Sequence, residues 1–361
     1  MSSLRTKQLR RELAPYAARS YAPGLAVLFR DLALFVGFTW FALFFESYWL
    51  KTLFAILAGT AIGSIFVIGH DAAHNALTPS KRLNALIGRI ALLPNLHNYT
   101  LWLIVHNRMH HVVPCVAGLN SWTPLSFEEY SRLPKWRQAI ERLYRVPFLG
   151  FAPYYARERW LKEKFFPPRH LAGTRRKGQY LDFALLALYL ATLFSLFYYA
   201  SLRIPHLQFW EAVVWGFVIP QWVWNTLGGF TVYTHHTHPR VTWYRSEAAM
   251  QAAGAGQEDV TVHMVFPAWY GVISNHIMDH PAHHVATKIP LYNLHRAQAR
   301  LNELLGERAI VERFSPLRYL ANMRRCQLYD YENRRWLSFS GQPTSETVPM
   351  PSRPEAAPAT A

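Results

Sequence analysis

Four long apolar stretches constrain the fold of this chain more than any other feature of its sequence. They cover residues 32–45, 52–69, 181–200 and 207–230. A helix needs about 20 residues to cross the hydrocarbon core of a bilayer, so the first stretch reaches that length only with its flanks. Short tips, ESYWLK and SLRIPH, join the stretches in two pairs. We therefore predict an all-α integral membrane protein with four transmembrane helices in two hairpins.

A further apolar stretch, residues 83–105, is interrupted by polar residues and proline, among them Asn84, Arg89 and Pro94. Charged and polar groups are costly within a lipid-exposed helix, so we interpret this stretch as an interfacial or re-entrant segment. Residues 1–30 are basic and lack the apolar core and small-residue cleavage site of a secretory signal. We expect them to form a cytoplasmic N-terminal tail.

The distribution of basic residues predicts the orientation of the chain. Of its 38 lysines and arginines, 36 lie outside the two predicted tips, which carry only Lys51 and Arg203. Cytoplasmic loops of membrane proteins collect lysine and arginine. The sequence therefore predicts that both termini and the segment 75–180 lie in the cytoplasm. Positive-inside topology and anionic lipid account for most of the formal charge of +16, and we expect no nucleic-acid partner.

Histidine is concentrated in three motifs, HDAAH (70–74), HNRMHH (106–111) and HIMDHPAHH (276–284). Each follows a predicted apolar segment, so all three are expected in a histidine-rich cap on the cytoplasmic face. A separation of four residues recurs in every motif and joins His70 with His74, His106 with His110, and His280 with His284. On a helix such side chains point the same way with Cβ atoms about 5–6 Å apart, which lets two imidazoles bind one metal ion. The adjacent His111 and His283 each add a ligand.

The number of clustered histidines indicates two metal ions. A structural zinc site closes with four ligands, whereas the paired and adjacent histidines named above number eight. Eight imidazoles would be costly to bury without partners. Imidazole suits iron, zinc, copper and nickel alike, so ligand type leaves the metal open. The scattered histidines are more typical of hydrogen-bonded interfacial residues, and these are His97, His170, His206, His263 and His295.

The motifs HDAAH, HNRMHH and HPAHH resemble the three histidine boxes of the membrane fatty acid desaturases in order and spacing. SWTPLSFEEY (121–130) is similar to the family's segment after the second box. THHTHP (234–239) is similar to the QHTHP of the methyl-end desaturases of plants and cyanobacteria. The resemblance covers about residues 30–300, so we predict a desaturase-type membrane domain over 31–300.

The resemblance implies a non-haem di-iron enzyme that uses O₂ to remove two hydrogens from adjacent carbons of a fatty acyl chain. It implies metal ligation by His70, His74, His106, His110, His111, His236, His280, His283 and His284. His236 matches the family's extra ligand, with His235 and His238 as rivals. His276 is expected either to form a hydrogen bond with a metal ligand or to be an alternative ligand itself. Asp71 either orients an imidazole by a hydrogen bond or is a solvated carboxylate.

The chemistry implied by the resemblance predicts further features. Side-chain acids and bases cannot cleave alkyl C–H bonds, so the cofactor must break them while the protein positions the acyl chain. We expect an apolar substrate tunnel with Trp222, Trp224 and Phe230 as candidate lining residues, although lipid-facing or interhelical packing explains each of them as well. No H-P-G-G haem motif or cysteine-rich cluster is present, so a separate donor, ferredoxin or a b-type cytochrome, should supply electrons.

Several alternatives stay open at this point. A hydroxylase, ketolase or acetylenase on the same scaffold would carry the same boxes, and the acyl carrier can be a membrane lipid or a thioester. A metal carrier is disfavoured because carriers place ionisable groups near the bilayer midplane. We expect a cytoplasmic C-terminal region over 301–339 and a disordered tail over 340–361, which is rich in proline, serine, threonine and alanine.

Overall fold

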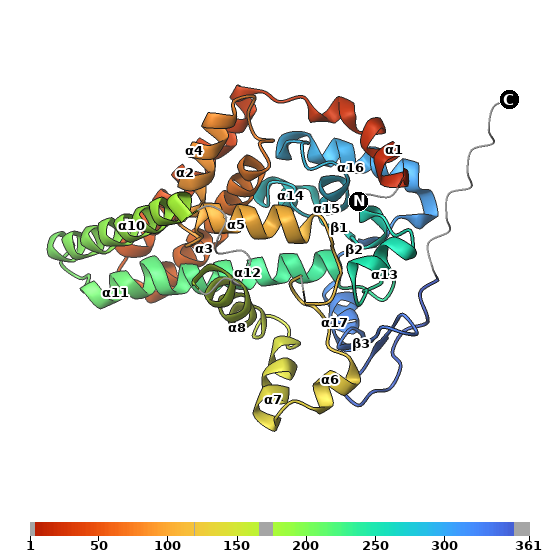
Figure 1. Ribbon diagram of the computed structural model, residues 1–361. Coiled ribbons are helices and arrows are strands. Elements are labelled where there is room, and N and C mark those ends of the chain that lie inside the picture. Colours follow the sequence, from red (N-terminus) through yellow and green to blue (C-terminus); the bar gives the residue numbers. More distant parts are fainter. Residues whose placement is uncertain (1–3, 119, 166–175, 350–361) are drawn as a thin grey trace.

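The computed structural model describes residues 4–118, 120–165 and 176–349, and this part of the chain is mostly helical (Figure 1). The α-helices are α1 (Leu4–Glu12), α2 (Tyr21–Phe44), α3 (Tyr48–Ala73), α4 (Lys81–Leu92), α5 (Tyr99–Val105), α6 (Phe127–Ser131), α7 (Lys135–Tyr144), α8 (Phe151–Tyr154), α10 (Arg176–Arg203), α11 (Phe209–Val213), α12 (Ile219–His236), α13 (Glu247–Ala252), α14 (Ala268–Ile273), α15 (His280–Val285), α16 (Leu291–Leu305) and α17 (Pro316–Arg325). The π-helices are η2 (His106–His110), η3 (Tyr155–Phe165) and η4 (Val214–Val218), and the 3-10 turns are η1 (Ala14–Ala17), η5 (Gln257–Asp259) and η6 (Gly306–Arg308). The strands are β1 (His263–Val265), β2 (Val311–Arg313), β3 (Leu328–Asp330) and β4 (Arg335–Leu337).

Three helices in the described part of the chain are long and apolar enough to cross a membrane: Tyr21–Phe44, Tyr48–Ala73 and Lys177–Arg203. They contain the predicted spans 52–69 and 181–200, and all of 32–45 except Phe45. Helix α3 is the central one, because 56% of its most apolar 18-residue segment is buried, against 22% for the corresponding segment of α2 and 11% for that of α10. Gly59 lets α12 come close to α3, since a Cβ there would lie 2.6 Å from Val223. The core of the helical bundle therefore lies around α3.

The fourth predicted span, 207–230, is divided among three consecutive helical segments, α11, η4 and α12. Pro220 stands in the first turn of α12 and lacks the N–H that an α-helix would bond to Gly216. A π-helical segment just before this proline accommodates the interruption in the helical series of backbone hydrogen bonds. Four membrane spans therefore remain a prediction, while three long apolar helices are observed.

Lys51, predicted to lie in the tip between two spans, is in the first turn of α3 and only 1% exposed. Its Nζ lies 3.1 Å from Glu211 Oε1 and 5.3 and 5.4 Å from the ring centroids of Tyr48 and Trp215. A carboxylate and two aromatic faces compensate for the loss of hydration. The link between α2 and α3 is consequently only three residues long, from 45 to 47.

Short helices, among them α4 and α16, cover the end of α3 at which its histidines lie, and two small sheets belong to the C-terminal half of the chain (Figure 1). β1 and β2 pair in parallel, and β3 and β4 pair antiparallel. The basic N-terminal segment contains α1, whose buried Leu9 belongs to one cluster with Ala282 and Val285 of α15. In the predicted disordered segment, Val348 N donates to Arg334 O at 3.0 Å, while residues 350–361 lie outside the described part.

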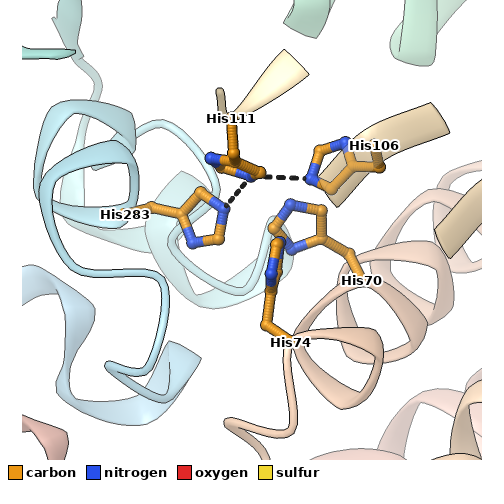
Figure 2. A group of neighbouring side chains, drawn as sticks. All are labelled: His70, His74, His106, His111 and His283. Atoms are coloured by element: carbon orange, nitrogen blue, oxygen red, sulfur yellow. Dashed lines mark hydrogen bonds between the residues drawn. The ribbon is translucent and has the colours of Figure 1, made fainter. Parts of the chain in front are cut away.

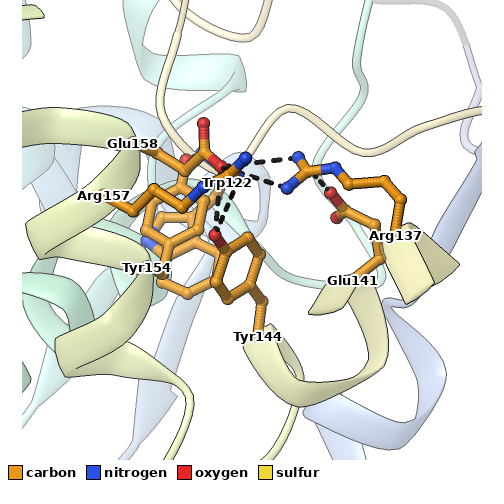
Figure 3. Close-up of polar contacts among 7 residues, drawn as sticks. All are labelled: Trp122, Arg137, Glu141, Tyr144, Tyr154, Arg157 and Glu158. Carbon is orange, nitrogen blue, oxygen red and sulfur yellow. Dashed lines mark hydrogen bonds and ion pairs between the residues drawn. The ribbon is translucent and has the colours of Figure 1, made fainter. Parts of the chain in front are cut away.

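A polar and aromatic network joins the loop after the second histidine motif to α7 and η3 (Figure 3). Glu158 Oε1 accepts a hydrogen bond from Tyr144 Oη at 3.0 Å and lies 3.4 Å from Arg137 Nη2. The Trp122 ring stacks on Tyr154 with centroids 3.5 Å apart, and its backbone N–H donates to the Tyr154 hydroxyl. These contacts fix the segment that begins directly after the histidines.

Candidate metal centre

Nine histidine side chains from four parts of the chain meet at the covered end of α3. Their possible ligand atoms form two groups, and within each group these atoms lie within 4.8 Å of one another. The first histidine group is His70, His74, His106, His111 and His283, and the second histidine group is His110, His236, His280 and His284. Figure 2 shows the first group, with rings that point toward a common centre from separate ribbons. These are the nine positions that the resemblance assigned as ligands.

The first motif lies at the end of the buried helix α3. His70 and His74 are one helical turn apart, and their ring centroids are separated by 4.9 Å. Both side chains are buried and belong to the first histidine group. This pair therefore follows the four-residue spacing of an α-helix.

The second motif does not follow that spacing, because its residues form the π-helix η2. His111 N donates to His106 O at 3.2 Å, the i to i+5 bond of a π turn. His106 consequently pairs with His111, with 2.9 Å between their Nε2 atoms, and His110 belongs to the second histidine group. The structure thus places His106 and His110 in different groups, whereas their spacing led us to expect that they share one ion.

The third motif supplies side chains to both groups from the short helix α15. His283 Nε2 lies 3.1 Å from His111 Nε2, and His284 Nε2 lies 3.1 Å from His110 Nε2. His280 shares the second histidine group with His284, one turn later in α15. The adjacent histidines of the second and third motifs thus face different groups.

The segment after the fourth apolar stretch contributes one member. His236 Nε2 lies 3.3 Å from His280 Nε2 within the second histidine group. The His235 ring stacks on that of His280 at 3.6 Å between centroids and belongs to neither group. His238 instead pairs with Glu312 at 3.1 Å.

Two further predicted residues lie outside both groups. Asp71 accepts a hydrogen bond from the backbone N–H of Leu291 at 2.8 Å, so its carboxylate joins α3 to α16. His276 lies before α15 and faces Asp279 and His295.

The donor set fits metal ions. Two nitrogens bound to one ion at about 2.1 Å would be about 3.0–3.4 Å apart, and the Nε2 pairs described above are separated by 2.9–3.3 Å. The buried atoms His70 Nδ1 and His74 Nε2 have no hydrogen-bond partner. Unsatisfied buried polar atoms are costly, and coordination would satisfy them.

Burial keeps these imidazoles neutral. It is the main cause that lowers the pKa of His106, His111, His283 and His284 well below the ordinary value, and neighbouring imidazoles add to the shift. A neutral imidazole offers a nitrogen lone pair, which is the form that binds a metal.

Oxygen atoms behind the second histidine group orient its rings. His236 Nδ1 donates to Val260 O at 2.9 Å, and His284 Nδ1 donates to Gln257 Oε1 at 2.8 Å. Each bond places the ring proton on Nδ1 and leaves the Nε2 lone pair directed at the group. Gln257 Nε2 also donates to His111 O at 3.0 Å, so one amide joins the second and third motifs. Sequence reasoning missed Gln257, because a glutamine between GAG and ED carries no recognisable signal.

An apolar cavity lies beside the site, with an empty volume of about 570 Å³ that includes space open to the outside. Trp224 and Phe66 line it, together with small and aromatic residues of α3, α12 and α14. The Phe66 ring also lies 6.4 Å from the His70 ring and 4.7 Å from Trp224. Among the three tunnel candidates only Trp224 belongs to this lining; Trp222 is 54% exposed, and Phe230 packs in the aromatic cluster around Tyr319.

Three long apolar helices, one of which carries His70 and His74 at its end, together with two buried histidine groups, are typical of a membrane protein with a site able to hold two metal ions. Residues 47–316 match the model of the fatty acid desaturase family, and the chain belongs to this family of oxidoreductases. The resemblance seen in the histidine motifs is thereby confirmed.

Curated relatives agree with this assignment. The chain is 30% identical over 294 residues to the sn-1 oleoyl-lipid 12-desaturase of Picosynechococcus sp., which covers 79% of this chain and 78% of that protein. It is 29% identical over 294 residues to the sn-1 acyl-lipid omega-3 desaturase (ferredoxin) of Synechocystis sp., with coverage of 80% and 77%. The chloroplastic omega-6 fatty acid desaturase of Spinacia oleracea is 27% identical over 292 residues, which are 81% of this chain and 62% of the spinach protein.

Proposed function

We propose that this protein is an O₂-dependent desaturase that introduces a double bond into the fatty acyl chain of a membrane lipid at a histidine-ligated di-iron centre. The observation that carries the proposal is the position of an apolar cavity beside two buried histidine groups. The cavity can accept a hydrocarbon chain, while the nine imidazoles can hold two ions near it.

The residues of the chain have separate tasks in this proposal. The two histidine groups would hold the irons, which when bound would supply the oxidising chemistry that an alkyl C–H bond requires. Val260 O and Gln257 keep the Nε2 atoms of His236 and His284 directed at the site. Phe66 and Trp224 separate the histidines from the cavity, exclude water and position the acyl chain.

The names of the relatives suggest the substrate and the electron donor. An oleoyl-lipid desaturase and an omega-3 desaturase act toward the methyl end, so we propose a chain that is already unsaturated as substrate. A ferredoxin is proposed as donor because one relative is named for it. A hydroxylase, ketolase or acetylenase is the alternative, since the same ligand set can serve these reactions.

We further propose four membrane spans with the metal site and both termini in the cytoplasm. The charge distribution supports this topology, because Lys51 and Arg203 alone fall near the opposite ends of the long helices. A reporter fused after Ala361 should be active in the cytoplasm. Activity only on the other side of the membrane would contradict the topology.

The function can be tested by expression in a host that lacks polyunsaturated lipids, followed by mass spectrometry of the extracted acyl chains. We expect a second double bond in monounsaturated chains and little conversion of saturated ones. The matched control is His284→Ala, which should insert into the membrane but yield no product. Hydroxylated products would support the alternative, and an iron-loaded protein that leaves every acyl chain unchanged would contradict the proposal.

A further inference from the structure

A third cluster of metal-ligating side chains lies outside the two histidine groups. His276, Asp279 and His295 bring their ligand atoms within 4.8 Å of one another. Asp279 Oδ2 lies 3.3 Å from His276 Nδ1 and 3.3 Å from His295 Nδ1. The Asp279 side chain is 8% exposed, whereas that of His295 is 70% exposed. The cluster therefore has a buried carboxylate and an opening to solvent.

The carboxylate of Asp279 is held in place by a hydrogen-bond relay. Gln298 Oε1 accepts from Ala282 N, and Gln298 Nε2 donates to Asn302 Oδ1, each at 2.8 Å. The amide nitrogen of Asn302 consequently faces His263 Nδ1 at 3.0 Å and donates to it. The His263 proton is then on Nε2, which donates to Asp279 Oδ1 at 3.1 Å.

This relay leaves the other carboxylate oxygen directed at the two remaining imidazoles. A carboxylate oriented by an outer histidine is the arrangement that tunes metal ligands in proteins.

The backbone also presents His276 in a costly conformation. Asn275 and His276 have φ values of 48° and 58°, in the left-handed region that residues other than glycine rarely adopt. The Asn275 side chain donates to Asp31 Oδ2 at 2.7 Å and to Ser64 O at 3.0 Å, which holds this turn. Gly271 leaves room for the ring, because a Cβ there would lie 3.0 Å from His276 Nδ1. The orientation of His276 is thus built into the fold.

We propose that His276, Asp279 and His295 form a third metal site that binds a divalent ion of the zinc class, separate from the two histidine groups. Two imidazoles and one carboxylate are ligands that Zn²⁺ accepts, with water in the remaining position. The donor separations of 3.3 Å match those expected for two ligands on one ion with bonds of about 2.1 Å. The bound ion would join α16, which carries His295, to the turn directly before α15, which carries His276 and Asp279.

The test uses iron-loaded, full-length protein without a polyhistidine tag. Equilibrium dialysis against Zn²⁺, followed by metal analysis, measures zinc bound in addition to iron. We expect one Zn²⁺ per chain for the unmodified protein. His295→Ala should bind it at least about tenfold more weakly, because loss of even an outer partner of a metal ligand costs about 10–100-fold in affinity. The matched control is His206→Ala, at the opposite end of the long helices, which should bind zinc unchanged.

A second variant reports ligation directly. His295→Cys, loaded with Co²⁺, should show a thiolate-to-metal charge-transfer band that the unmodified protein lacks. The iron content of the His295 variants should stay unchanged, since His295 belongs to neither histidine group. Absence of extra zinc, equal zinc affinity in His295→Ala, or absence of the cobalt band would overturn the proposal. None of these outcomes bears on the desaturase function.

Discussion

Replacement of Gln257 by leucine should weaken iron binding although Gln257 is not itself a proposed ligand. Its amide accepts from His284 Nδ1 at 2.8 Å and donates to His111 O at 3.0 Å. Leucine has a similar size but neither polar atom, so His284 loses the bond that orients its ring. Residues that form hydrogen bonds with metal ligands contribute about 10–100-fold to metal affinity, which corresponds to about 1.4–2.7 kcal/mol. The cost of an unsatisfied buried donor, about 1–3 kcal/mol, has the same size.

The assay is the rate and extent of iron loss to a chelator, measured beside the thermal melting temperature of the iron-loaded protein. Gln257→Glu keeps the acceptor oxygen and should retain more iron than Gln257→Leu. Gln251→Leu is the matched control, because Gln251 is exposed and bonds only to Glu247 among the described contacts. Equal iron retention in Gln257→Leu and the unmodified protein would refute the role of this amide.

Three other substitutions test separate parts of the structure. His236→Ala should lower the iron content and abolish activity. His235→Ala should keep most of the iron, because His235 only stacks on His280, a member of the second histidine group. Equal iron content in both variants would contradict the ligand assignment. Gly63→Leu should shift the products toward shorter acyl chains in mass spectrometry, since the leucine side chain would extend into the cavity. If Gly63→Leu and the control Gly63→Ala give the same chain-length profile, the cavity is not the acyl site. Lys51→Met should destabilise the fold by about 3–5 kcal/mol, because it leaves the buried Glu211 carboxylate without its cationic partner. A melting temperature that the double variant Lys51→Met/Glu211→Met fails to restore would show that the pair is not the cause.

Much of the site could be predicted from the sequence because its chemistry is local. The ligand types and their positions in three motifs are visible in the chain, and the nine histidines that they and THHTHP indicated do converge. Three of the apolar stretches likewise became long helices, since hydrophobicity over about 20 residues is a local property.

The division of ligands between the two groups could not be predicted in the same way. Whether HNRMHH forms an α or a π turn depends on packing around it, and the π turn transfers His110 to the second group. Gln257 and Asp279 act through partners far away in the sequence, such as His111 and His263. Burial of Lys51 likewise depends on Glu211, 160 residues later.

The split of adjacent histidines between the two groups has a thermodynamic consequence. His110 and His111 belong to one turn, and His283 and His284 to another, so each turn contributes to both groups. An ion that enters either group orders both turns and thereby prepares the neighbouring group. Such coupling is reciprocal, with a typical free energy of about 1–3 kcal/mol. Loading should therefore be cooperative, and the chain with a single ion should be the scarcest species during a metal titration.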